Sequence, residues 1–151
     1  MNREKFPRGK RSVEEKRSEL RGEDLAGVWL AGADLKGADL QDADLKGADL
    51  KNAYLRNAIL EGADLIDVDL KGAKLEGAEL KDAKLVNADL RGADLKGADL
   101  TGANLSHANM QDTNLFRINL KGADLFRTNL KGVDLTGVDI SNAFLDKWAD
   151  N

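Results

Sequence analysis

The hydrophobic residues of this chain recur every five residues. All 24 leucines, from Leu20 to Leu145, stand at residue numbers divisible by five, and Met110 and Ile140 fill the two gaps in the series. The residue two places before each of them is usually Ala, the next is usually Asp or Asn, and Gly often stands two places after. Any fold for this chain must therefore explain a period of five.

Neither a single α-helix nor a long strand explains this spacing. Five residues turn a helix by about 500°, so successive leucines would wind around it without forming an apolar stripe. In a strand, side chains alternate with a period of two, and an odd repeat would move each Leu to the opposite face. The period fits a chain that turns once per repeat.

The repeat Ala33-Asp34-Leu35-Lys36-Gly37 shows how one turn per repeat sorts the side chains. Ala33 and Leu35 point inward and Asp34 and Lys36 outward, while Gly37 takes the corner, where the lack of a Cβ eases a tight turn. Short strands that bend around one axis and stack on their neighbours form a β-solenoid. We therefore expect an all-β solenoid whose interior is filled by Leu and Ala.

Tandem copies of A(D/N)LxG, from about Ser18 to Leu145, resemble the pentapeptide-repeat family over about five-sixths of the chain. The resemblance implies a right-handed quadrilateral (four-sided) β-helix with four pentapeptides per coil. With four pentads per coil the chain would make about six coils, and at about 4.8 Å per coil a rod about 30 Å long. The expected parts are a basic N-terminal segment (1–19), the β-helix (20–146) and a C-terminal tail (147–151).

Both ends of such a rod expose unpaired strand edges, which the flanking residues are able to cover. Ser12-Val13-Glu14-Glu15 has the S-x-x-E pattern of a capping box, which predicts a short helix over about 13–19. Val13 and Leu20 would lie on the first coil. At the other end, bulky side chains form a candidate end cap or homodimer contact, for which the family offers precedent: Phe144, Leu145 and Trp148.

Composition narrows the class of protein. The 151 residues suit one domain, and the absence of Cys rules out disulfides and thiolate metal sites. No apolar stretch reaches the length of a signal peptide or a membrane helix, so we expect a cytoplasmic protein without a membrane partner. The bases near the N-terminus predict a solvated tail more than a nucleic-acid or membrane contact: Arg3, Lys5, Arg8, Lys10 and Arg11.

Under the four-sided interpretation, outward residues sort into four faces, each named here by its first full pentad. The Leu25 face carries net charge −3, the Leu30 face 0, the Leu35 face +1 and the Leu40 face −4. Some family members confer quinolone resistance and are thought to mimic duplex DNA on type II topoisomerases. B-DNA carries about 18 charges over 30 Å, against −7 for residues 20–151. Asp and Lys ladders would also neutralise each other on the Leu30 face. Mimicry is therefore the alternative function, not the first.

The sequence offers little chemistry for catalysis. Stacked carboxylates at Asp24, Asp44 and Asp64 resemble a divalent-cation site, but neighbouring lysines favour a solvated ladder. His107 stands at a corner beside Ser106 on a convex wall, without the pocket or third group that a general base needs. We expect no enzyme activity, no cofactor and no metal.

Outward apolar residues are the remaining candidate for a site. Ile66, Val86 and Phe126 follow Leu on the Leu25 face and would line up along the rod as a partner surface, although β-propensity alone also explains them. The triplet Leu-Phe-Arg occurs twice, and the Phe of its first copy, Phe116, falls half a coil away from Phe126 on the opposite face. The expected function is a non-enzymatic scaffold that presents its faces to an unknown protein partner.

Overall fold

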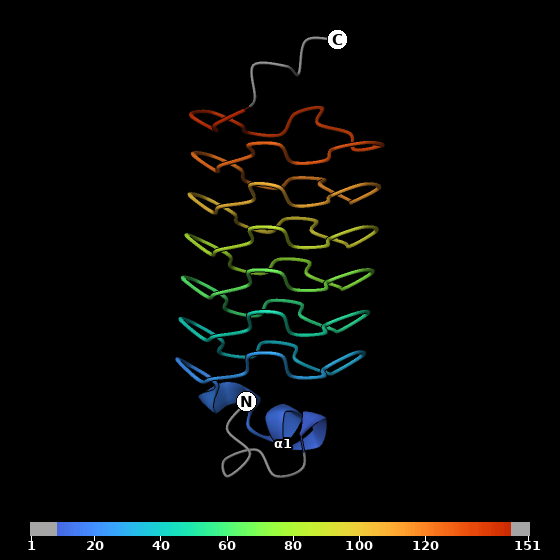
Figure 1. Cartoon of the computed structure of the whole chain (residues 1–151). Coiled ribbons are helices and arrows are strands. Elements are labelled where there is room, and N and C mark those ends of the chain that lie inside the picture. The colour runs from blue at the N-terminus through green and yellow to red at the C-terminus, as the bar shows by residue number, and fades with distance from the viewer. Residues whose placement is uncertain (1–8, 146–151) are drawn as a thin grey trace.

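A computed structural model describes residues 9–145, which form a stack of coils with two short helices at one end (Figure 1). Helix α1 spans Lys10–Glu15 and the 3-10 helix η1 spans Arg17–Glu19. From there on, parallel bridges join equivalent residues of pentads four repeats apart, such as Asp24 with Asp44 and Asp44 with Asp64. Each coil therefore holds four pentads and has four faces.

Each side of a coil contributes only one bridging residue. The described residues contain isolated parallel bridges but no extended strand, whereas the sequence suggested short strands. The reason is the turn in every pentad: the N–H of Ala38 donates to the carbonyl of Leu35 at 3.1 Å, with Gly37 between them at φ 61°. A turn of this kind needs positive φ at its third residue, so too few residues remain for an extended run.

The side chains that the pentad pattern predicts to point inward are buried in the structure. The Leu and Ala rows of the middle coils are buried, as Leu75 and Ala73 illustrate, and they form one continuous apolar core. Cross-coil hydrogen bonds satisfy the backbone around this core; for example, the N–H of Leu55 donates to the carbonyl of Lys74 at 2.7 Å. Burial of each Leu side chain contributes about 1.5–3 kcal/mol relative to exposure.

Asp or Asn before the Leu has a local structural role that the sequence alone did not reveal. The Oδ1 of Asp44 accepts a hydrogen bond from the N–H of Lys46 at 3.0 Å, and Asn104 Oδ1 accepts one from Ser106 at 2.9 Å. Short side chains with an acceptor oxygen close such Asx turns. The acidic ladders are therefore first of all part of the backbone's hydrogen bonding.

The N-terminal helices cover the first coil. Val13 is fully buried, Glu14 Oε1 accepts a hydrogen bond from the N–H of Asp34 at 2.8 Å, and the carbonyl of Arg17 accepts one from Asp39 at 2.8 Å. In later coils the equivalent N–H groups donate to the preceding coil, as Tyr54 does to Ala33. The helices thus satisfy part of an edge that would otherwise be open.

The capping-box interpretation is wrong in detail. Ser12 lies inside α1 and is buried, the residue before the helix is Gly9, and no side chain caps this end. Glu14, which the pattern counted as the second position after the cap, instead bonds the first coil. The helix begins earlier because Val13 and Ser12 must face the coil, and packing outweighs the local capping signal.

The stack opens at its other end, on the Leu35 face. Among residues 9–145, no bridge joins Asn114 to Asp134, and no backbone hydrogen bond joins Leu115 to Asp134. A gap of about 330 Å³ separates the two coils there. On this face four alanines of the Ala row are followed by Thr113 and then Val133, two β-branched side chains in successive coils. Such a succession does not open the stack by itself, because Ile118 and Val138 follow each other on the Leu40 face and the bridge between Asn119 and Asp139 is kept. Thr113 differs from Ile118 by its hydroxyl group, which donates hydrogen bonds to the carbonyls of Met110 and Leu90.

Candidate functional site

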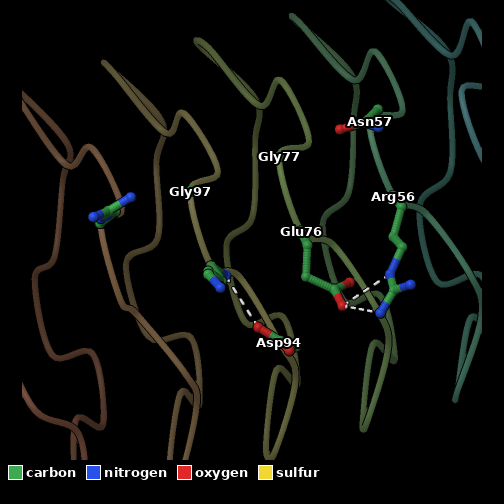
Figure 2. A pocket seen from close by; sticks show the side chains of 8 residues that line it. Arg56, Asn57, Glu76, Gly77, Asp94 and Gly97 are labelled. Atoms are coloured by element: carbon green, nitrogen blue, oxygen red, sulfur yellow. Dashed lines mark hydrogen bonds and ion pairs between the residues drawn. The ribbon is translucent and has the colours of Figure 1, made fainter.

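A groove crosses the coils of the Leu35 face, with a volume of about 560 Å³ (Figure 2). It exists because Gly77 and Gly97 leave two neighbouring corners without side chains, between Asn57 on one side and Arg117 on the other. Residues that follow or precede the Leu of each pentad complete its walls. The groove is lined by Arg56, Asn57, Glu76, Gly77, Asp94, Lys96, Gly97 and Arg117.

One ion pair lies in the groove. Arg56 Nε donates to Glu76 Oε1 at 2.9 Å across adjacent coils. The hydrogen bond from Arg56 holds the pKa of Glu76 below its usual range, although burial opposes this, and the pairing raises the pKa of Arg56. Glu76 Oε2 is buried and has no hydrogen-bond partner in the part of the chain that the structure describes. Glu76 therefore carries a full negative charge that Arg56 balances.

The other cations of the groove are held by an aromatic ring. Lys96 Nζ lies 5.7 Å and the Arg117 guanidinium carbon 5.1 Å from the ring centroid of Phe116, which is 56% exposed. Asp94 is already engaged, since its Oδ1 accepts hydrogen bonds from Asn114 Nδ2 at 2.9 Å and from the Lys96 N–H at 3.1 Å. Lys96 and Arg117 make no ion pair with any residue in 9–145.

The predicted stripe of the Leu25 face lies in one row. The N–H of Asp67 donates to the carbonyl of Val86 at 3.0 Å and the N–H of His107 to that of Phe126 at 2.8 Å, which places these outward positions one above another. Ile66, Val86 and Phe126 are each half-buried, not fully exposed. Ser106 separates Val86 from Phe126, so the row is apolar with one polar interruption.

Phe126 belongs to an aromatic cluster that sequence reasoning missed. Its ring meets His107 edge-on at 5.7 Å and lies 6.2 Å from the ring of Phe144, which is 61% exposed. Phe144 stands one coil above Asp124, to which it is bridged. The signal was present in the spacing of 19 between His107 and Phe126, but it appears only once residues are compared across coils.

The open end exposes apolar side chains. Of the predicted end-cap residues, Phe144 and Leu145 are exposed, and Leu135 and Ile140 beside them are partly uncovered. Trp148 lies outside the described residues. The last coil therefore presents an apolar end surface.

The Leu30 face carries the ladder of alternating charges that the sequence predicted. Lys51 Nζ lies 3.3 Å from Asp49 and 3.1 Å from Asp69. The series continues through Lys71, which lies 3.3 Å from Asp89, and ends at Arg91, which lies 2.7 Å from Asp89. The hydrogen bond from Arg91 lowers the pKa of Asp89 to about 2. These charges neutralise each other along the face.

Neither a metal cluster nor a membrane span is found within residues 9–145. Asp24, Asp44 and Asp64 are stacked, but no group of three or more His, Asp and Glu side chains there is arranged to hold a metal ion. No described helix is long and apolar enough to cross a bilayer. His107 takes a corner at φ 60° and contacts Phe126 rather than a nucleophile.

Sequence reasoning also missed the groove of the Leu35 face. Its signal lies between pentads four repeats apart: Arg56 precedes Glu76, and Lys96 precedes Phe116. Consecutive glycine corners also occur at Gly72 and Gly92 and at Gly102 and Gly122, so Gly77 and Gly97 do not mark the groove without the charged residues beside them. These features become visible when the chain is written as rows of four pentads.

A chain that closes a four-sided coil every four pentads, with Leu and Ala inside and Gly or Asx at the corners, is a β-solenoid of pentapeptides. The family model for pentapeptide repeats matches in eight copies, over residues 18–57, 48–85, 83–122 and 113–147. The chain belongs to the pentapeptide repeat family.

Solved structures agree with this assignment. The chain is similar to the pentapeptide repeat protein Rfr23 from the cyanobacterium Cyanothece 51142, at 29% identity and a TM-score of 0.63 over 93% of this chain and 99% of that one. It is similar to alr5209, a pentapeptide repeat protein from Nostoc PCC 7120, at 34% identity and a TM-score of 0.57 over 68% of this chain and 84% of that one.

A more distant likeness is to QnrB1, a plasmid-mediated fluoroquinolone resistance protein, at 23% identity and a TM-score of 0.51 over 87% of this chain and 86% of that one. At this level of identity the likeness shows the fold alone. No match was found among the curated proteins.

Proposed function

We propose that this protein is a cytoplasmic, non-enzymatic scaffold, a right-handed four-sided rod that docks a protein partner on its Leu25 face. The observation that carries the proposal is the aromatic cluster of Phe126 and Phe144 at the end of the row of Ile66 and Val86. Exposed aromatic side chains supply large contact area at low entropic cost. Half-buried Ile66 and Val86 would extend that contact along the rod.

The matched test uses the two Leu-Phe-Arg triplets. Phe126→Glu should remove partners that the wild-type protein retains, whereas Phe116→Glu, an equivalent change on the opposite face, should leave them bound. Both phenylalanines follow a Leu and lie 5.1 Å from the guanidinium of the next Arg. Phe126 is half-buried against His107 and Phe144 whereas Phe116 is 56% exposed, so the stability of each variant must be measured beside its binding. The readout is affinity capture with quantitative mass spectrometry, with thermal unfolding to verify that both variants fold. Loss of the same partners in both variants, or in neither, contradicts the proposal.

We also propose that two rods associate through the apolar end formed by Phe144 and Leu145, with Trp148 as the third predicted contact. Exposed Leu135 and Ile140 support it, since an apolar end with an unpaired edge favours association. Light scattering tests the idea: Leu145→Lys should convert a dimer into a monomer, and a wild-type protein that is monomeric at all concentrations contradicts it.

The alternative is a DNA mimic that binds a type II topoisomerase. The shared fold with QnrB1 is consistent with it. The ion pairs of Lys51 and Lys71 with Asp69 and Asp89 count against it, because they neutralise a face that a mimic needs to keep negative. A gyrase supercoiling assay separates the two functions: strong inhibition, or protection from a quinolone, favours the mimic, and no effect favours the scaffold.

A further inference from the structure

The groove of the Leu35 face has the length of a short extended peptide. It reaches from Asn57 to Arg117, which lie three coils apart, or about 15 Å at the spacing of paired strands. That is the length of about four to five extended residues. A Cβ built at Gly97 would meet nothing within 4 Å, so this corner of the groove is open, whereas the side-chain oxygen of Asn57 lies over the corner at Gly77.

The charges available to a ligand are positive. Glu76 is paired with Arg56, and Asp94 accepts hydrogen bonds from Asn114 and from the Lys96 backbone. Lys96 and Arg117, by contrast, rest against Phe116, and neither forms an ion pair within residues 9–145. A ring positions a cation through its π face without using its N–H donors, which stay available to an oxyanion.

A single phosphate would use only part of this arrangement. Lys96 and Arg117 lie against one ring on adjacent coils, so a small anion paired with both would fill only that end of the groove and leave the stretch back to Asn57 empty. In an extended peptide, side chains on the same side recur about every 7 Å, so two alternate acidic residues reach the flexible side chains of Lys96 and Arg117 while the rest of the peptide follows the groove. We propose that this groove binds an acidic, extended segment of a protein, whose carboxylates pair with Lys96 and Arg117.

This site is independent of the proposed docking on the Leu25 face. The Leu25 and Leu35 faces are separated by half a coil and lie on opposite sides of the rod, as the bridges at Asp24 and Asp34 define. A protein that uses both faces would hold two partners on opposite sides. Either site can fail in experiment while the other stands.

The test is a titration of the isotopically labelled full chain by NMR with a short acetylated peptide of alternating Gly and Glu. The amide signals of Gly77 and Gly97 should shift saturably, while those of Gly47 and Gly72, on other faces, should stay within noise. The analogue with Gln in place of Glu should produce no saturable shift, and inorganic phosphate only weak shifts.

Variants assign the binding to the two cations. Lys96→Gln and Arg117→Gly should each weaken peptide binding about fivefold, the size expected for an exposed charge pair. Arg117 has φ 60°, so Gly is tolerated there and the fold is preserved. The matched control is Arg127→Gly, a corner at φ 54° whose guanidinium lies 5.1 Å from Phe126 on the opposite face, and it should change binding less than twofold.

Four results with the peptide overturn the proposal. They are equal binding of the Gln analogue, equal shifts at Gly47 and Gly72, an equal loss of binding in Arg127→Gly, and the absence of any saturable shift. Phosphate that reproduces the full shifts at the affinity of the peptide also overturns it, because the groove would then be a site for a point anion.

Discussion

The middle coils and the last coil share one Leu grid, yet the middle is closed on every face and the last is open on one. In the middle, Val28 and Val68 occupy the Ala row without breaking the ladder, because their neighbours across the coils are Ala48 and Ala88. In the last coil, by contrast, Val133 follows a β-branched residue directly, and the bridge is lost. Bulk alone is not the difference, because Ile118 and Val138 follow each other on the Leu40 face and the bridge between Asn119 and Asp139 is kept.

The difference separates the roles of the two inward rows. The row of large inward residues continues through both regions, with Met110 and Ile140 in place of Leu. The Ala row sets how closely one coil approaches the next, since the methyl group of Ala leaves room for hydrogen bonds at 2.7–3.1 Å. Three comparisons of variants test how the closed and the open regions differ.

The largest contrast is expected between two leucines of the same face. Leu75→Ala should lower the free energy of unfolding by about 3–5 kcal/mol, because Leu75 is fully buried and its removal leaves a cavity. Leu135→Ala should cost about 1 kcal/mol, because Leu135 is 37% exposed at the open end. Urea unfolding followed by circular dichroism measures both. Equal losses would contradict the distinction between closed and open coils.

Acid should act on the middle coils at the charged ladder. The pKa of Asp89 is lowered to about 2 by Arg91, so its contribution is present above the usual pKa near 4 and is lost as pH falls from 4 toward 2. Because solvent screens this partly exposed ion pair, we expect its loss to lower the free energy of unfolding by about 1–2 kcal/mol. Unfolding of the wild-type protein and of Asp89→Asn at several pH values measures it.

Asp89→Asn should flatten the pH dependence in that window. Asp124→Asn serves as the control, because Asp124 makes no ion pair within residues 9–145 and accepts only a turn hydrogen bond from Phe126. If the pH dependence of the free energy of unfolding changed equally in both variants, the charged ladder would not be its cause.

The smallest effect on stability, and the most direct test of closure, is Val133→Ala. It should let Asp134 approach Leu115 and restore the missing hydrogen bond, worth about 1 kcal/mol. Hydrogen exchange should then slow about fivefold at the Leu115 amide. Val68→Ala, in an intact part of the Ala row, should instead destabilise the protein and slow exchange nowhere. Unchanged exchange at Leu115 in Val133→Ala would show that bulk in the Ala row is not the reason for the gap.

Much of the fold followed from the sequence because the period of five leaves few alternatives. The inward positions, the corner at Gly37 and the Asp–Lys ladder were all predictable from single pentads or from rows of four pentads. The exact start of α1 was not, because burial of Ser12 and Val13 outweighed a local capping pattern. The gap at Leu115 was not either, since two β-branched residues in succession open the stack at Thr113 and Val133 but leave it closed at Ile118 and Val138.

The candidate site was predicted less well. Ile66, Val86 and Phe126 do share one row, but their half-burial and the contacts of Phe126 with His107 and Phe144 depend on rotamers that no pattern specifies. The groove at Gly77 and Gly97 arises from missing side chains, which a search for functional residues passes over.

The four-pentad register also constrains how such a chain is able to change in length. Deletion of one pentad leaves every Leu on the grid and the core intact, but it rotates all later outward residues by one face. If the deleted pentad lay between Glu76 and Lys96, Lys96 and Phe116 would stay paired with each other. Both would move to a different face from Arg56 and Glu76, and the groove would be divided. Surfaces that span several coils therefore survive gains or losses of whole coils only, so natural duplications that preserve a binding face should come in multiples of four pentads.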